Sequence, residues 1–228
     1  MQRKLIQSAL LMTALLQSII AMATEEPKYT LLATIDGVEY RQYAPYLVAE
    51  TVIADEADRD TAASEGFRRL FKYISGANTT KTPISMTAPV QQTPNRKIAM
   101  TAPVQQTLAA DGWTVGFTVP GEFTEETTPK PTSADVAIRA VPGQLMAVIK
   151  YSGRWTDQNL KQHADELVRK LGATGITAAG EIVSAAYNAP FTPPFMRRNE
   201  VMVAVDCNDP VNFCSGIIPL TNGASVSN

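Results

Sequence analysis

The sequence predicts an α+β fold with a mainly antiparallel, curved sheet and two helices. The order strand, strand, helix, strand occurs twice along the chain, at about 29–120 and again at about 134–206. Each helix is indicated by apolar residues at helical spacing, and the strands around it are rich in Val, Thr, Tyr and Leu. We therefore expect one domain over residues 24–206, built from two similar β-α-β halves.

Strands are predicted where β-branched and aromatic residues are concentrated between turn signals. In the first half these segments are Tyr29–Ile35, Glu39–Ile53 with a turn at Ala44-Pro45, and Trp113–Val119. In the second half they are Asp135–Val141, Gln144–Tyr151, Glu181–Tyr187 and Glu200–Val205. The Thr-, Pro- and Glu-rich stretch 122–133 has no periodicity, so we expect a surface loop there.

Two helices are predicted from apolar residues that recur every three or four positions. The first has apolar residues at Phe67, Leu70, Phe71 and Ile74, a possible cap at Asp60 and a possible left-handed end at Gly76. The second runs from about Asp157 to Leu171, with Thr156 as cap, Gly172 as its end and a buried stripe of Leu160, Ala164, Leu167 and Leu171.

A ten-residue sequence motif occurs twice, as Ile84–Thr93 and Ile98–Thr107, offset by 14 residues. Alternate positions are apolar in both copies, which is typical of half-buried strands. If the chain folds back around Pro94, the apolar faces coincide and Val90 opposes Ile98, so we predict a hairpin between the copies. Pro89 and Pro103 cannot donate hydrogen bonds to a ladder, so we expect them at an edge or a bulge, where the sheet stops pairing.

Residues 1–23 are typical of a secretory signal peptide, because two basic residues precede an apolar stretch that ends in Ala21-Met22-Ala23. We expect cleavage after Ala23, an exported protein that is periplasmic or secreted, and no stable membrane span afterwards. A retained membrane anchor is the alternative. The chain has 20 basic and 22 acidic residues. Since the signal contains two basic and no acidic residues, the remainder carries a net charge of −4, which argues against a nucleic-acid partner.

The two cysteines, Cys207 and Cys214, lie in a C-terminal tail, residues 207–228. In an oxidising compartment so short a loop can close as a disulfide, and two unpaired thiols are the alternative. The spacing is not that of a CxxC redox motif, and no cluster of histidines accompanies it, so we expect no metal site in the tail.

The chain has one histidine, His163, beside the apolar stripe of the second predicted helix. A nucleophilic triad would need this histidine beside a serine or cysteine. The P-loop, GxGxxG, GxSxG and HExxH patterns do not occur in the sequence. We therefore assign no catalytic residue, treat His163 as a weak candidate for a metal ligand, and favour a binding protein over an enzyme.

The segment 189–198 combines three prolines with Phe191 and Phe195 and with Arg197 and Arg198. Aromatic rings can pack against a flat apolar ligand, while guanidinium groups can bind its carboxylates. The first predicted helix and the methionines of the repeat supply further apolar side chains. The sequence therefore indicates a site for a large, flat, acidic ligand.

Four motifs stand in order along the chain: Tyr40-Arg41-Gln42-Tyr43, the helix segment from Phe67 to Asn78, the Met-Thr-Ala-Pro-Val phrase, and Tyr187-Asn188-Ala189-Pro190 followed by Arg197-Arg198-Asn199-Glu200. In these motifs the chain, to about Val205, resembles the SOUL haem-binding protein family, as a bacterial, exported member. The resemblance implies a distorted, barrel-like sheet flanked by two helices. It also implies non-covalent binding of haem or another tetrapyrrole in a hydrophobic groove, for sequestration or transport.

The resemblance places this groove between the first helix and the loop before the last strand. The ligand-binding residues that it implies are Phe67, Phe71, Lys72, Tyr187, Pro190, Phe191 and Phe195, to which the residues' own chemistry adds Met86, Met100, Arg197 and Arg198. The axial histidine proposed in some members has no obvious counterpart here. Two alternatives remain: an enzyme that removes the metal from a tetrapyrrole, using His163 or Glu200, and an envelope protein-interaction module.

Overall fold

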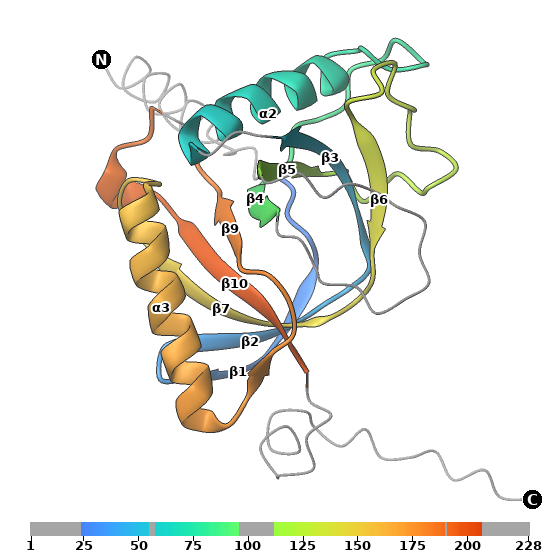
Figure 1. Ribbon diagram of the computed structural model, residues 1–228. Coiled ribbons are helices and arrows are strands. Elements are labelled where there is room, and N and C mark those ends of the chain that lie inside the picture. The colour runs from blue at the N-terminus through green and yellow to red at the C-terminus, as the bar shows by residue number, and fades with distance from the viewer. Residues whose placement is uncertain (1–23, 55–57, 96–111, 190, 207–228) are drawn as a thin grey trace, which may run out of the picture.

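The computed structural model describes residues 24–54, 58–95, 112–189 and 191–206. Labelled as in Figure 1, its elements are β1 (Tyr29–Ile35), β2 (Val38–Tyr43), β3 (Tyr46–Ala54), α2 (Arg59–Ile74), β4 (Val90–Asn95), β5 (Gly112–Thr118), β6 (Ala137–Val141), β7 (Leu145–Tyr151), α3 (Asp157–Thr174), β8 (Thr177–Ala178), β9 (Val183–Ala186), the 3-10 turn η1 (Pro194–Met196) and β10 (Asn199–Asp206). The predicted signal peptide, the second copy of the repeat with Met100, Pro190, and the cysteines lie outside the described residues. Within those residues, no helix is long and apolar enough to cross a membrane.

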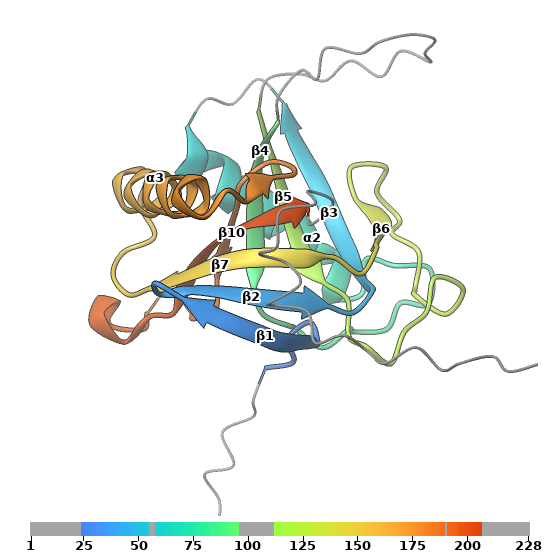
Figure 2. The ribbon, with the colours of Figure 1, turned by 90° about the horizontal axis from the view of Figure 1, so that it is seen from below.

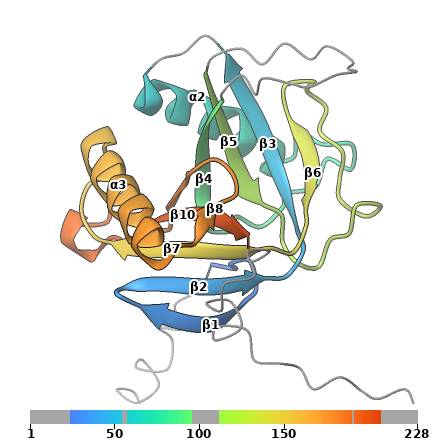
Figure 3. The ribbon, with the colours of Figure 1, turned by 60° about the horizontal axis from the view of Figure 1, so that its bottom comes forward.

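The strands form one antiparallel sheet in the order β1-β2-β7-β10-β9-β4-β5-β3-β6, with the short β8 beside β10. Figures 1 and 2 show this sheet curled into a barrel-like shape, with β1 and β6 as its two ends. Helix α2 packs on β3 and β5, and α3 packs on β7 and β10 (Figure 3). The predicted α+β fold with a barrel-like sheet flanked by two helices is confirmed.

Successive side chains along each strand point to opposite faces of the sheet. On β10, Val201 and Val203 pack beneath α3, whereas Met202 packs inside the curl of the sheet. The predicted stripe of α3 lies on the outer face, where Leu167 and Leu171 are buried. Helix α2 covers a second outer cluster, which includes Leu70, Tyr73, Ile74, Val115, Phe117 and Val119.

The helix ends differ from the prediction by a few residues. The N-cap of α2 is Asp58, whose carboxylate accepts a hydrogen bond from the Thr61 amide at 2.7 Å, so the expected cap at Asp60 was wrong. Thr156 caps α3 as predicted. That helix continues past Gly172 and ends at Gly175, whose φ of 74° is the left-handed conformation that favours glycine.

The predicted hairpin between the two repeat copies is wrong, because β4, which contains the end of the first copy, pairs with β5 and β9 instead. Val90 opposes Phe117 on β5 and Ala186 on β9, so both edges of β4 are already paired at this position. Pro94, the expected turn, lies within β4 opposite Trp113. Residues before Val90 are not a strand, because their backbone groups bond elsewhere: the Ile84 amide donates to the Ile74 carbonyl, and the Ala88 amide donates to the Glu25 carbonyl.

Candidate functional site

Phe67 and Phe71 lie on the C-terminal half of α2, and Met86 lines a small cavity at the end of this helix; we call these three side chains the α2 patch. The rings of Phe67 and Phe71 are stacked at 5.9 Å between centroids, because they stand one helical turn apart on the same side of α2. Phe71 is 48% exposed and Met86 is 42% exposed, whereas Phe67 is partly buried. The exposed part of the patch can therefore accept an apolar ligand.

A row of three paired residues leads away from this patch across the sheet. Phe117 on β5 opposes Val90 on β4, and Val90 opposes Ala186 on β9. The Phe67 ring meets the edge of the Phe117 ring at 5.3 Å, which ties the row to α2. Since neighbouring strands are about 4.8 Å apart, the row spans roughly 10 Å. Paired residues share one face of a sheet, so the row lies on the outer face below α2.

The row ends where the connection from β9 to β10 begins, and we call residues 187–189 and 191–198 of this connection the late loop. Phe191, Phe195 and Met196 are 89%, 79% and 63% exposed, respectively. Hydrogen bonds hold the tip of the loop: the Arg197 Nε donates to the Thr192 carbonyl at 2.7 Å, and the Gly153 amide donates to the Pro194 carbonyl at 2.9 Å. The large apolar side chains are thus displayed on a tethered loop.

The predicted cationic residues occupy different environments. Lys72 is exposed on α2, one position from Phe71. Arg197 is half-buried at the base of η1. The Arg198 guanidinium is directed inward instead: it donates to Glu200 at 2.9 Å and to Glu26 at 3.0 Å. The charge of Arg198 is therefore balanced within the protein, whereas Lys72 is exposed at the surface beside the α2 patch.

The sheet encloses a buried ionic network around Glu200, which is 0% exposed. Arg41, also 0% exposed, donates two hydrogen bonds to the Glu200 carboxylate at 2.8 and 2.9 Å. The Tyr187 hydroxyl donates to the same carboxylate at 2.7 Å. Burial works to raise the pKa of Glu200, but the hydrogen bonds and charge of Arg41 outweigh it, so this pKa lies below its usual value. Burial, reinforced by the Glu200 charge, raises the pKa of Tyr187.

His163 stands on α3 and is part of neither the α2 patch nor the late loop. Its ring stacks on Tyr151 of β7 at 4.2 Å between centroids, and its Nδ1 lies 3.4 Å from a carboxylate oxygen of Glu166. Strands β10 and β9 separate β7 from β4 in the sheet. Among the described residues, no group of three or more His, Cys, Asp or Glu side chains could hold a metal ion.

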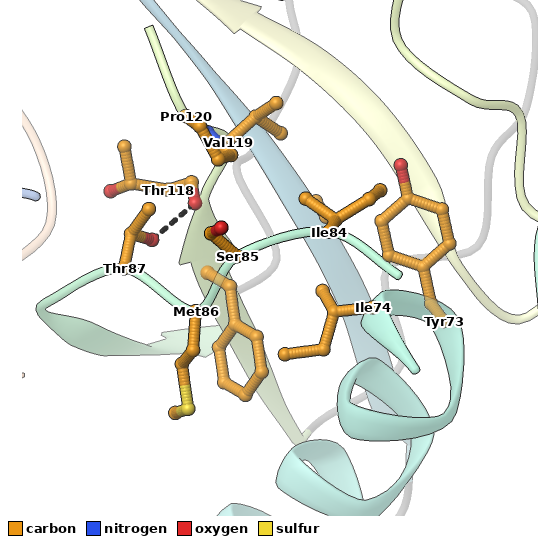
Figure 4. Close-up of a pocket in the computed structure, with 11 residues that line it drawn as sticks. Tyr73, Ile74, Ile84, Ser85, Met86, Thr87, Thr118, Val119 and Pro120 are labelled. Carbon is orange, nitrogen blue, oxygen red and sulfur yellow. Dashed lines mark hydrogen bonds between the residues drawn. The ribbon is translucent and has the colours of Figure 1, made fainter. Parts of the chain in front are cut away.

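A small cavity lies between the end of α2, the segment 84–87 and the end of β5 (Figure 4). Tyr73 and Ile74 line one side, Met86 lies at its mouth, and the Thr87 hydroxyl donates to the Thr118 carbonyl across it. Its volume is about 10 Å³, which is room for about one water molecule. A large flat ligand cannot enter this cavity.

The structure thus places the predicted site residues in three groups. Phe67, Phe71, Lys72 and Met86 lie on or beside α2, and Phe191, Phe195 and Arg197 lie on the late loop, while Tyr187 and Arg198 point into the ionic network. Sequence reasoning missed Met196 and the row of Phe117, Val90 and Ala186. The row could not be found from sequence, because it depends on which strands pair.

A chain with this curled sheet, two outer helices and an exposed aromatic surface fits the class of small-molecule binding proteins. The sequence model of the SOUL heme-binding protein family matches residues 24–204. The chain belongs to this family.

The chain is also similar to individual proteins. It is 25% identical over 193 residues to "Heme-binding protein 2" of Mus musculus, with 82% of this chain and 89% of that protein covered. Among solved structures, the C-terminal domain of EcmrR matches with a TM-score of 0.52 and 10% identity, covering 78% of this chain and 98% of that one. A conserved protein from Listeria innocua matches with a TM-score of 0.53 and 11% identity, covering 76% and 94%. These two structures share the fold.

Proposed function

We propose that this chain binds haem or a related tetrapyrrole non-covalently on its outer surface, between the α2 patch and the late loop, and that it sequesters or carries this ligand. The observation that carries the proposal is the exposure of Phe71 and Met86 in the α2 patch and of Phe191 and Phe195 on the late loop, which begins directly after Ala186 at the end of the row. Covering such side chains with a flat ring system removes apolar area from water, at about 25 cal/mol per Å².

Family membership and the similarity to the mouse heme-binding protein support the same ligand class. The electrostatics of the surface are also suitable, because Lys72 lies beside the α2 patch and Arg197 lies on the late loop. Either cation can pair with a propionate carboxylate of a tetrapyrrole. Pro190 and Met100, which the sequence also indicates as ligand-binding residues, lie outside the described residues.

We further propose that the ligand is bound outside the cytoplasm, after cleavage behind Ala23. The apolar segment and its small-residue ending support export. The intact mass of the exported protein tests this, since cleavage leaves a chain that begins at Thr24.

A metal-removing enzyme is less well supported by the geometry. Its two candidate groups were His163 and Glu200. The Glu200 carboxylate is buried and already accepts hydrogen bonds from Arg41, Tyr187 and Arg198. His163 stacks on Tyr151 beneath α3. Glu200 is fully buried and His163 stands on α3 rather than α2, so neither belongs to the exposed apolar surface where the ligand is proposed to lie.

The experiment is a titration of haemin into the purified protein, followed by the absorption spectrum. We expect a saturable shift of the Soret band with one haemin per chain and no later change in the spectrum. Loss of the metal with time would support the enzyme instead. A spectrum identical to that of free haemin at all ratios would contradict the proposal and favour a protein partner for the late loop.

A further inference from the structure

The ionic network inside the sheet joins both ends of the late loop. Tyr187 and Arg198 are the first and last residues of this loop, and both donate to the Glu200 carboxylate, at 2.7 and 2.9 Å. The Arg198 guanidinium also lies 3.8 Å above the centre of the Tyr187 ring. One buried carboxylate thus gathers the two ends of an exposed loop.

Backbone hydrogen bonds close the base of the loop around this contact. The Tyr187 amide donates to the Arg198 carbonyl at 3.2 Å, and the Arg198 amide donates to the side-chain oxygen of Asn188 at 2.6 Å. Asn199, which follows, donates to the Gly153 carbonyl at 3.1 Å. The loop therefore leaves and re-enters the sheet at a fixed point.

The same network reaches the other side of the proposed site through the segment 24–28. Glu26 accepts a hydrogen bond from Arg198 at 3.0 Å, and the neighbouring Glu25 accepts one from the Ala88 amide at 2.9 Å through its backbone carbonyl. Ala88 lies two residues after Met86 of the α2 patch. Pro27 is buried, which fixes this segment against the protein. The late loop and the segment that carries Met86 are thus tied to one stretch of chain.

We propose that Glu200 is a positioning residue: by holding Tyr187 and Arg198, with Arg41 as its buried counter-ion, it sets the conformation in which the late loop presents Phe191 and Phe195. Its role in ligand binding rests on the proposed function. A loop that is ordered before binding loses less conformational entropy when the ligand docks, so an intact network should raise affinity.

The test uses Glu200→Gln, which keeps the shape of the side chain but removes its charge, and Tyr187→Phe, which removes only the donated hydroxyl. Hydrogen exchange is measured in the ligand-free protein at the amides of Thr192, Met196 and Arg197, which donate hydrogen bonds to the carbonyls of Ala189, Pro193 and Pro194 within the loop. We expect exchange at these amides to rise by about tenfold or more in both variants. Tyr187→Phe keeps the proposal testable if Glu200→Gln does not fold.

Two matched controls separate positioning from general destabilisation. Glu50→Gln breaks an exposed carboxylate–arginine pair with Arg139, whose hydrogen bonds are equally short at 2.8 to 3.0 Å. Val201→Ala removes buried volume from the same strand as Glu200, on the face beneath α3. Neither control should change exchange in the late loop, because such exchange reports local opening rather than global unfolding.

The outcomes distinguish this inference from the proposed function. Unchanged loop exchange in both Glu200→Gln and Tyr187→Phe would overturn the inference, whatever the protein binds. If loop exchange does rise in these variants, their haemin titrations should show about fivefold or greater loss of affinity, with the controls unchanged. Loosened loops with wild-type haemin affinity would overturn the positioning role in binding. A wild-type protein that binds no haemin would remove the proposed function, while faster loop exchange would still support control of the loop by Glu200.

Discussion

At the scale of single residues, Arg41 and Glu200 form a fully buried ion pair. Both side chains are fully buried, so each has lost its hydration and depends on the other for compensation. The motif Tyr40-Arg41-Gln42-Tyr43 and the motif that ends in Glu200 lie about 160 positions apart in the sequence, and the fold brings them into one bidentate contact.

Replacing Arg41 by alanine should lower the free energy of unfolding by about 3–5 kcal/mol, because the buried Glu200 carboxylate loses its fully buried counter-ion and two hydrogen bonds and keeps only Arg198 and Tyr187 as partners. The control is Arg139→Ala, which removes an exposed arginine from its pair with Glu50 and should cost about 1 kcal/mol or less. Urea unfolding of both variants measures the difference. Equal effects would show that the burial of the Arg41 pair does not matter for stability.

At the scale of elements, α2 approaches the sheet closely because of one glycine. A Cβ atom at Gly66 would lie 2.5 Å from the Cβ and Cγ2 atoms of Val115 on β5, well inside normal contact distance. This close approach brings Phe67 onto Phe117 and so sets the position of the α2 patch. Gly172, within α3, would have open space around a Cβ atom.

We therefore expect opposite effects from two glycine-to-alanine substitutions in helices. Gly66→Ala should destabilise the protein by about 1–3 kcal/mol, since overpacking outweighs the better helix propensity of alanine. Gly172→Ala should stabilise it by up to about 1 kcal/mol, because only the propensity changes. Thermal and urea unfolding measure both. A neutral Gly66→Ala variant would show that α2 can move away from β5 at little cost.

Most elements could be predicted from the sequence, since helices and strands follow from periodicity and turn residues that act locally. The stripe of α3 and the cap at Thr156 are examples. The hairpin predicted from the repeat was wrong. Matching apolar patterns indicate which residues can lie on the same face, but not which strands are neighbours in the sheet. The pairing of Val90 with Ala186 joins residues 96 positions apart, and no local signal encodes it.

The candidate site was predicted in part for the same reason. Phe71, Phe191 and Phe195 could be identified as exposed aromatics from composition and resemblance, and the structure places all three at the surface. Arg198 was expected to meet the ligand, yet its guanidinium is engaged with Glu200 and Glu26. Sequence alone does not say whether an arginine points outward or into an interior network.

At the scale of the whole molecule, the two faces of the curled sheet carry different groups of residues. The inner face holds the ionic network and the apolar cluster that includes Met202, while the outer face carries both helices, the α2 patch and the late loop. The cavity at the end of α2 has room for about one water molecule. The account therefore requires surface binding by exposed rings, with the inner face giving the surface its fixed shape.

The most direct test of this account is the haemin affinity of Phe191→Ala/Phe195→Ala, compared with two single variants. Each ring contributes roughly 1–3 kcal/mol when it is well covered, so the double variant should bind haemin about tenfold or more weakly. His163→Ala and Leu31→Ala, the latter a half-exposed side chain on edge strand β1, should bind as the wild type does. Normal binding by the double variant, together with loss of the Soret shift in His163→Ala, would contradict the account.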